Sequence, residues 1–291
     1  MKLLSIALLA LSLTGSVLAC SEDGKSGFLP ENNLRIPVGS KALGGISEAE
    51  FNAVIDKVEA IYAPMASSMG GNLKIARKWS DATVNANATR IGGWNVNMYG
   101  GLARHATITS DGFALVLCHE IGHHMGGAPK VSGMLGLNRW ASNEGQADYY
   151  ATLKCLRHTF LNDNNSLVLK KLKAPATLVA ACSKAWPNKD DKAICVRSGM
   201  AGASVAGLFA ALRSQPEAKF ETPDAKVVAK TDDAHPAHQC RLDTYFQGAL
   251  CEKTLNDENV SQKEEVAGTC HGTLGHKIGV RPLCWFKPKK S

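Results

Sequence analysis

Two histidines and a glutamate in the sequence HEIGH have the spacing of a metal site, since His119 and His123 stand four residues apart and Glu120 follows the first. On a helix, residues four apart project from the same face, so both imidazoles can reach one metal ion. Zn²⁺ is the expected cofactor, because imidazole nitrogen is a preferred ligand of this ion. Glu120 can bond a metal-bound water without touching the metal, which suits a general base for the attack of water on a carbonyl.

A third ligand is needed, because a catalytic zinc keeps three protein ligands and one position open to water. Glu144 is the candidate, since it opens the next expected helix in the sequence EGQADYY. Asp148 follows one turn later on the same face, where it can accept the spare N–H of a ligating imidazole. The expected metal ligands are therefore His119, His123 and Glu144.

Plainer roles are open to several polar side chains near these motifs. His119 and His123 could be core histidines that bond to backbone carbonyl groups. Helical geometry turns His124 away from the metal face, toward a supporting contact or the surface. Tyr149 and Tyr150 are expected to pack in the core, although either hydroxyl could assist an oxyanion.

Two helices must position the candidate ligands. The run FALVLCHEIGHHM is apolar almost all round, follows Ser110 or Asp111 as a cap, and stops at a Gly-Gly pair. This pattern predicts a buried helix that carries the first motif. After a loop expected over 128–141, Ser142 begins a second helix that extends to about residue 160.

The rest of the chain predicts a small sheet and further helices. Ser47 and Glu50 form a capping-box pattern before an amphipathic helix. Alternation of apolar residues predicts two antiparallel strands, at 82–88 and 94–98. A third strand is expected at about 102–109, and two helices are expected near 198–213 and 236–249. The predicted fold class is α+β, mainly helical, with a small antiparallel sheet.

Three motifs, in this order along the chain, resemble those of the gluzincin peptidases, a family that includes the CAAX prenyl endopeptidases and the HtpX heat-shock protease. The matching residues are His119-Glu120-x-x-His123, Glu144 with Ala147-Asp148, and His235-Pro236 with Arg241. The resemblance covers roughly residues 47–246 and implies a zincin-type metallopeptidase fold. It also implies that His235 stabilises the oxyanion and that Arg241 orients Glu144 or the substrate. From the residues alone, His235 beside Pro236 could equally cap a helix.

The chain also departs from those family members. It lacks their transmembrane helices and has eight cysteines beyond the signal segment, so processing of prenylated proteins and quality control of membrane proteins are not expected. We expect a zinc-dependent endopeptidase that hydrolyses a peptide or protein substrate. The alternatives are a non-catalytic or chaperone-like envelope protein and a purely structural zinc site, which the intact Glu120 and the open fourth position disfavour.

The segment from Gly100 to Thr109 precedes the metal helix, where peptidases of this resemblance present an edge strand to the substrate. An extended peptide could pair there through main-chain hydrogen bonds. His105 within this segment is expected to be an ordinary strand histidine.

The N-terminus predicts export. A single lysine, an apolar run and small residues before Cys20 form a signal peptide, and Cys20 lies in a lipobox-like sequence. Setting Cys20 aside for acylation leaves an even number of cysteines, which suits disulfides in an oxidising compartment. The expected location is the cell envelope, as a periplasmic protein or outer-membrane lipoprotein, with plain secretion as the alternative. We expect a signal peptide at 1–19 and a tether or irregular lead-in at 20–46. A zinc metallopeptidase domain is expected at 47–250, with a cysteine-containing extension packed on it at 251–291.

The remaining cysteines are expected to staple the fold by disulfides and not to bind zinc, because no C-x-x-C sequence occurs. Three pairs are inferred from short loops, and the last pair ties the two ligand helices together. The connectivity of the eight cysteines stays open, and the pairs that this reasoning favours are Cys182–Cys195, Cys240–Cys251, Cys270–Cys284 and Cys118–Cys155.

The formal net charge of +7 is spread along the chain without an aromatic-interleaved basic stripe. No nucleic-acid partner is therefore expected. Contact with a membrane is expected through the lipid anchor alone. The oligomeric state has no signature in the sequence.

Overall fold

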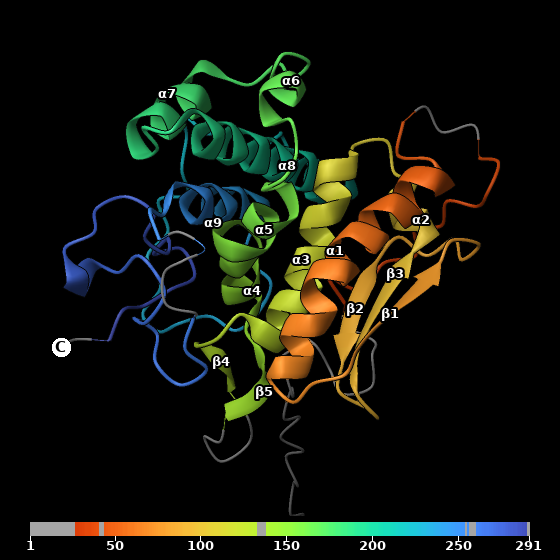
Figure 1. The fold of residues 1–291 in the computed structure, drawn as a ribbon, viewed down its shortest axis with the longest axis horizontal. Helices are drawn as coiled ribbons and strands as arrows, with labels where there is room; N and C mark the ends of the chain where they lie inside the picture. The colour runs from red at the N-terminus through yellow and green to blue at the C-terminus, as the bar shows by residue number, and fades with distance from the viewer. Residues whose placement is uncertain (1–26, 41–43, 133–137, 254, 256–259, 290–291) are drawn as a thin grey trace, which may run out of the picture.

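The structure is a computed structural model that describes residues 27–40, 44–132, 138–253, 255 and 260–289 (Figure 1). The expected signal peptide and the acylation site at Cys20 lie outside these described residues.

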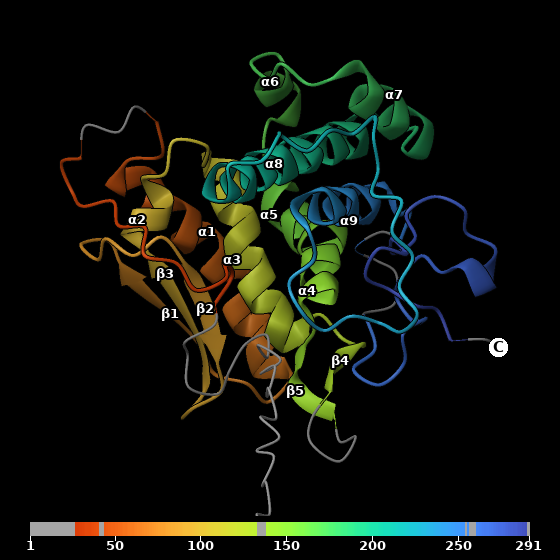
Figure 2. The ribbon, with the colours of Figure 1, turned by 180° about the vertical axis from the view of Figure 1, so that it is seen from behind.

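One buried helix, α3 (Ser110–Met125), lies at the centre of the fold. On one side it contacts α1 (Glu48–Ser68) and a small sheet, and on the other side it contacts α4 (Glu144–Tyr150) and α8 (Lys189–Arg213). Helix α9 (His238–Leu250) packs on α4 and α8 (Figures 1 and 2). The helix that carries HEIGH is thus covered from both sides, as its apolar composition predicted.

The sheet contains β1 (Leu73–Lys78), β2 (Ala86–Thr89) and β3 (Trp94–Tyr99) in the order β1-β3-β2. The antiparallel pairing of β2 with β3 confirms the predicted pair of strands, although β2 begins at Ala86 and not at residue 82. Strand β1 was not predicted, and it pairs with β3 in parallel, so the sheet is mixed. The segment LKIARK has only two buried apolar positions among cationic ones, which left a weak alternation signal.

The prediction of a third strand at about 102–109 is wrong. The chain forms a short helix there, α2 (Gly100–Ala103), followed by a turn. Arg104 fixes this turn, because its buried guanidinium donates to the carbonyl oxygens of Ile36 and Trp79. The side chain of His105 bonds to Thr107 within the same turn and is not on a strand.

Local capping signals placed the first helix correctly. Ser47 is the N-cap of α1, and its capping box with Glu50 is present. The apolar face of α1 buries Phe51, Ile55 and Val58 against the core. Burying each such side chain stabilises the fold by roughly 1.5–3 kcal/mol.

The segment expected to be a loop over 128–141 contains two strands, β4 (Lys130–Ser132) and β5 (Asn138–Ser142), which pair antiparallel. Asn143, and not Ser142, caps α4 by accepting a hydrogen bond from the Gln146 amide. The helical run then continues beyond α4 to residue 160, as predicted, but its middle turn is π-helical.

Two short helices that were not predicted, α6 (Asn165–Leu169) and α7 (Ala176–Ala185), precede α8. Helix α8 begins earlier than the predicted residue 198 because Asn188 caps it through its side chain. Within the described residues, α8 is the one helix long and apolar enough to cross a membrane. Its most apolar window is 78% buried inside the protein, so it serves as a core helix.

Four disulfides staple the fold. The predicted pairs Cys118–Cys155 and Cys182–Cys195 are confirmed. The other two predicted pairs are wrong, because the bonds are Cys240–Cys284 and Cys251–Cys270. Short loops favoured the predicted pairs, but closing a longer loop adds little entropy cost, and the position of the folded C-terminal segment decides.

The ends of the described chain both pack on the domain. In the C-terminal segment Trp285 is fully buried and donates to the Thr244 hydroxyl of α9. At the other end, the lead-in is irregular as expected, but Phe28 and Leu29 belong to the main hydrophobic core. The described part of the lead-in is therefore built into the fold.

Candidate metal centre

Three potential ligands meet between α3 and α4. One nitrogen of His119, one nitrogen of His123 and a carboxylate oxygen of Glu144 all lie within 4.8 Å of one another, and the three side chains are buried. Nε2 of His119 lies 3.3 Å from Oε2 of Glu144, and Nε2 of His123 lies 3.6 Å from Oε1. The structure thus brings together the three residues that the spacing singled out.

Close packing of the two helices makes this meeting possible. A β-carbon on Gly122 would lie 3.0 Å from the Ala147 carbonyl oxygen, so glycine at this position lets α3 approach α4. The Cys118–Cys155 disulfide then ties α3 to the π-helical turn that follows α4. The ligands consequently come from two elements that are held together covalently.

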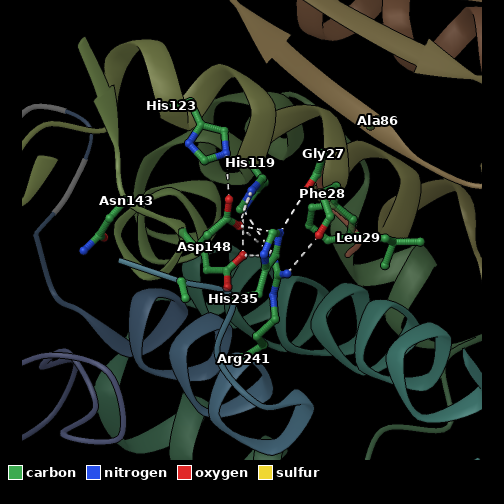
Figure 3. A network of polar contacts seen from close by, with 12 residues as sticks. Gly27, Phe28, Leu29, Ala86, His119, His123, Asn143, Asp148, His235 and Arg241 are labelled. Carbon is green, nitrogen blue, oxygen red and sulfur yellow. Dashed lines mark hydrogen bonds and ion pairs between the residues drawn. The ribbon is translucent and has the colours of Figure 1, made fainter. Parts of the chain in front are cut away.

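Each histidine of the pair has its second nitrogen occupied. His119 Nδ1 lies 2.7 Å from Asp148 Oδ1, and His123 Nδ1 lies 2.8 Å from the Ser142 carbonyl oxygen. A carbonyl or an ionised carboxylate only accepts, so Nδ1 carries the proton in both rings. The lone pair of each Nε2 is then directed toward the ligand cluster. Figure 3 shows His119 and His123 converging near Asp148.

Arg241 compensates the buried negative charge. Its guanidinium donates to Asp148 Oδ1 at 2.6 Å and lies 4.0 Å from Glu144 Oε2. Burial raises the pKa of Asp148, but Arg241 and His119 outweigh burial and hold this pKa below its usual value. One guanidinium faces two carboxylates, so a second positive charge, either a protonated imidazole or a metal ion, completes the charge balance.

Glu120 is the most exceptional group of the cluster. Both of its carboxylate oxygens are buried without a hydrogen-bond partner among the described residues. Burial raises the pKa of Glu120 to about 8. A buried acceptor with no partner costs about 1–3 kcal/mol, so a carboxylate in this state points to a ligand such as water beside a metal ion.

The imidazole of His119 gives a second indication of a cation. Its Nε2 is buried and makes no hydrogen bond of good geometry with any described residue. Burial lowers the pKa of His119, but Asp148 and Glu144 outweigh it and raise this pKa to about 9. A metal ion would take the place of that proton. Two imidazoles and one carboxylate fit a divalent cation that accepts nitrogen and oxygen ligands.

His235 reaches the centre from a loop before α9. Its Nε2 lies 3.4 Å from Glu144 Oε2 and donates to the Gly27 carbonyl oxygen at 2.8 Å. The capping alternative is wrong, because Ala237 is the N-cap of α9 and the cap has no side-chain hydrogen bond. Asp233 anchors the loop, since its carboxylate accepts from the Asn143 side chain.

The other polar residues of the motifs serve packing. His124 is buried and stacks between the rings of Trp94 and Trp140, away from the ligands as expected. Burial lowers the pKa of His124 to about 3, so this ring is neutral at physiological pH. Tyr149 and Tyr150 are both buried in the core, and the Tyr149 hydroxyl donates to the Gly279 carbonyl oxygen.

Sequence reasoning missed the contribution of the lead-in. Gly27 and Phe28 lie against His235, Arg241 and His119 although they precede them by many residues. The apolar pair Phe28-Leu29 within a polar segment was the one signal that could have indicated a buried anchor.

A second cluster of potential ligands, Asp224 with Cys240 and Cys284, is no metal centre, because the two cysteines are joined in a disulfide. This agrees with the prediction that the cysteines are staples. Comparison of the chain with protein-family models, with curated proteins and with solved structures found no match.

Proposed function

We propose that this chain is a zinc-dependent endopeptidase that hydrolyses peptide bonds in proteins or peptides of the cell envelope. The observation that carries the proposal is Glu120, a buried carboxylate without a hydrogen-bond partner among the described residues, next to a three-ligand metal centre. A structural metal site has no use for such a group. The four disulfides support an oxidising compartment, and the signal sequence supports export.

His119, His123 and Glu144 would hold Zn²⁺, which when bound would supply Lewis acidity toward the scissile carbonyl and a water. Glu120 accepts the proton of the attacking water and passes it to the leaving amine. Glu120 is buried next to the three ligands, where one carboxylate can both take and return a proton.

Two neighbours of the ligands support this chemistry. Asp148 fixes the ring of His119 through Nδ1, and Arg241 holds Asp148 in place. Nε2 of His235 lies beside Glu144 and donates to the Gly27 carbonyl oxygen, so stabilising the negative charge that develops on a substrate oxygen requires this N–H to be shared between the two acceptors. The role of His235 is the one that the resemblance to the gluzincin motifs implies, whereas Arg241 lies closer to Asp148 than to Glu144, the residue that the resemblance implied it would orient.

The position expected for an edge strand needs revision. Residues 100–103 form a helix, whereas β1 and β2 are the two edge strands of the sheet, and β2 contacts the metal helix α3. Part of that edge is already used, because the Ala86 carbonyl oxygen accepts from the Phe28 amide. A peptide substrate that pairs with this sheet would therefore use the remainder of β2.

The proposal is tested with purified residues 21–291, comparing the wild type with Glu120→Gln. We expect one zinc per chain in both proteins, and a fall of about 100-fold or more in cleavage of casein or a quenched peptide for the variant. Glu48→Gln, at an exposed position in the first turn of α1, serves as the control and should cleave like the wild type. A folded wild type that binds no zinc would refute the metal centre. Equal cleavage by the wild type and Glu120→Gln would refute the role of Glu120.

A further inference from the structure

The segment Gly27–Leu29 is part of the wall of the metal centre. Its main chain runs along the edge of β2, where the Phe28 amide donates to the Ala86 carbonyl oxygen at 2.8 Å. The Leu29 amide donates to the Asn85 side chain at 2.9 Å. All three residues of the segment are buried, and Figure 3 shows them beside His119, His235 and Arg241.

Glycine is required at position 27 by the closeness of the neighbouring backbone. A β-carbon at Gly27 would lie 2.1 Å from the Ala86 carbonyl oxygen, which is far inside van der Waals contact. Backbone atoms cannot move aside as the end of a flexible side chain can. The close approach places the Gly27 carbonyl oxygen 2.8 Å from Nε2 of His235.

This hydrogen bond selects the chemical state of His235. A carbonyl oxygen only accepts, so Nε2 must carry a proton. A protonated imidazole nitrogen cannot bind a metal ion, yet this nitrogen lies only 3.4 Å from Glu144 Oε2. The Gly27 carbonyl thus keeps His235 as a hydrogen-bond donor beside the centre and leaves the fourth position open.

Phe28 acts on the other side of the centre. Its carbonyl oxygen accepts from Arg241 at 3.1 Å, and its ring lies under the Arg241 guanidinium at 4.4 Å. The same ring meets the imidazole of His119 edge-on, with the ring centroids 4.8 Å apart. The contacts of Phe28 therefore restrict the positions of Arg241 and His119.

We propose that Gly27–Leu29 is a positioning segment of the active site, which fixes His235 as a donor and Arg241 against Asp148. The inference rests on the proposed function, since it assigns these roles within a hydrolytic zinc site. It also makes the lead-in a working part of the mature enzyme, although the segment lies more than 90 residues before the first ligand.

The test compares wild type, Gly27→Ala and the control Gly272→Ala, whose added β-carbon would meet nothing within 4 Å. Nitrogen-15 NMR of the imidazoles at one fixed pH, in metal-free protein, reports which nitrogen of His235 is protonated, with the signal assigned by its loss in His235→Gln. We expect a protonated, hydrogen-bonded Nε2 in the wild type and in Gly272→Ala, and its loss in Gly27→Ala.

X-ray absorption of the zinc-loaded proteins and kinetics supply two further measurements. We expect two imidazole ligands in the wild type and a third in Gly27→Ala, where Nε2 of His235 is released. We also expect kcat to fall about 100-fold in Gly27→Ala with little change in KM, because a misplaced donor affects the transition state more than binding. Gly272→Ala should match the wild type in both measurements.

The outcomes separate this inference from the proposed function. A wild type with Nε2 of His235 unprotonated, or a Gly27→Ala protein with unchanged NMR, zinc ligation and kinetics, overturns the positioning role. If the wild type binds no zinc or cleaves nothing, the NMR comparison in metal-free protein still decides the contact. If Gly27→Ala does not fold, Phe28→Leu tests the contact with Arg241 by the same kinetic comparison, and unchanged kcat in Phe28→Leu overturns the positioning role.

Discussion

Replacing Arg241 by methionine should be among the most destabilising single changes in this protein. The guanidinium is fully buried, donates to Asp148 at 2.6 Å, and is stacked between the rings of Phe28 and Phe209. Methionine keeps the apolar stem of the side chain but removes the guanidinium group with its charge. Asp148 would then keep the His119 imidazole but lose its closest cationic partner, and breaking a buried ion pair from one side costs about 3–5 kcal/mol.

A double-mutant cycle separates the ion pair from general packing. Asp148→Asn alone leaves Arg241 without its closest counter-charge and should also cost several kcal/mol, about the range for a broken buried pair. The double variant removes both charges, so its loss should be smaller than the sum of the single losses by about 2 kcal/mol. The assay is urea unfolding of zinc-free protein with its disulfides intact, followed by tryptophan fluorescence.

Arg213→Met provides the control, because Arg213 is exposed at the end of α8. Its loss should stay within about 1 kcal/mol, the size of a charge effect at a helix end. The reasoning fails if Arg241→Met costs no more than the control, or if the two changes at Arg241 and Asp148 are strictly additive. In either case the negative charge at the centre would be compensated by something other than this pair.

Two further predictions concern a disulfide and a buried histidine. Replacing Cys118 and Cys155 by alanine should cost about 4 kcal/mol in urea unfolding, from a sequence separation of 37 residues, and should weaken zinc binding measured by chelator competition. Removing the Cys182–Cys195 disulfide should leave the zinc affinity unchanged. If both removals change the zinc affinity equally, the Cys118–Cys155 disulfide has no special link to the metal centre. Because burial holds the pKa of His124 at about 3, below the unfolded value of 6.5, its contribution to stability is present above pH 6.5 and is lost as pH falls toward 3. His124→Phe should therefore lose less stability than the wild type between pH 7.5 and pH 5 in urea titrations, and equal losses would exclude this residue as a cause.

The features that could be predicted from the sequence are those that depend on residues a few positions apart in the chain. The capping box of Ser47 with Glu50 and the four-residue step from His119 to His123 each lie within one helical turn or the next. Glu144 and Asp148 likewise share one face of a short helix, so Asp148 meets His119 as the spacing predicted. Helix geometry alone relates such residues, without knowledge of the rest of the fold.

The features that could not be predicted depend on contacts between distant segments. Parallel pairing of β1 with β3 leaves no signature beyond two alternating apolar residues. The partner of Cys240 depends on the C-terminal segment returning to the start of α9, where Trp285 is buried. The carbonyl oxygen of Gly27 accepts from His235, and that of Ser142 accepts from His123. Every residue has a backbone carbonyl group, so the residue types do not show which one will bond.

The positions of the disulfides suggest how a fold tolerates such a centre. Buried charges and acceptors without partners, such as Glu120, are unfavourable for folding before a metal binds. Two of the four disulfides begin at the residue next to a member of the cluster, since Cys118 precedes His119 and Cys240 precedes Arg241. By restricting the unfolded chain, each bond offsets part of the unfavourable free energy of the groups beside it. The metal-free protein should for this reason stay folded when oxidised, with its ligands already in place, and should lose the arrangement of the centre first when these two bonds are reduced.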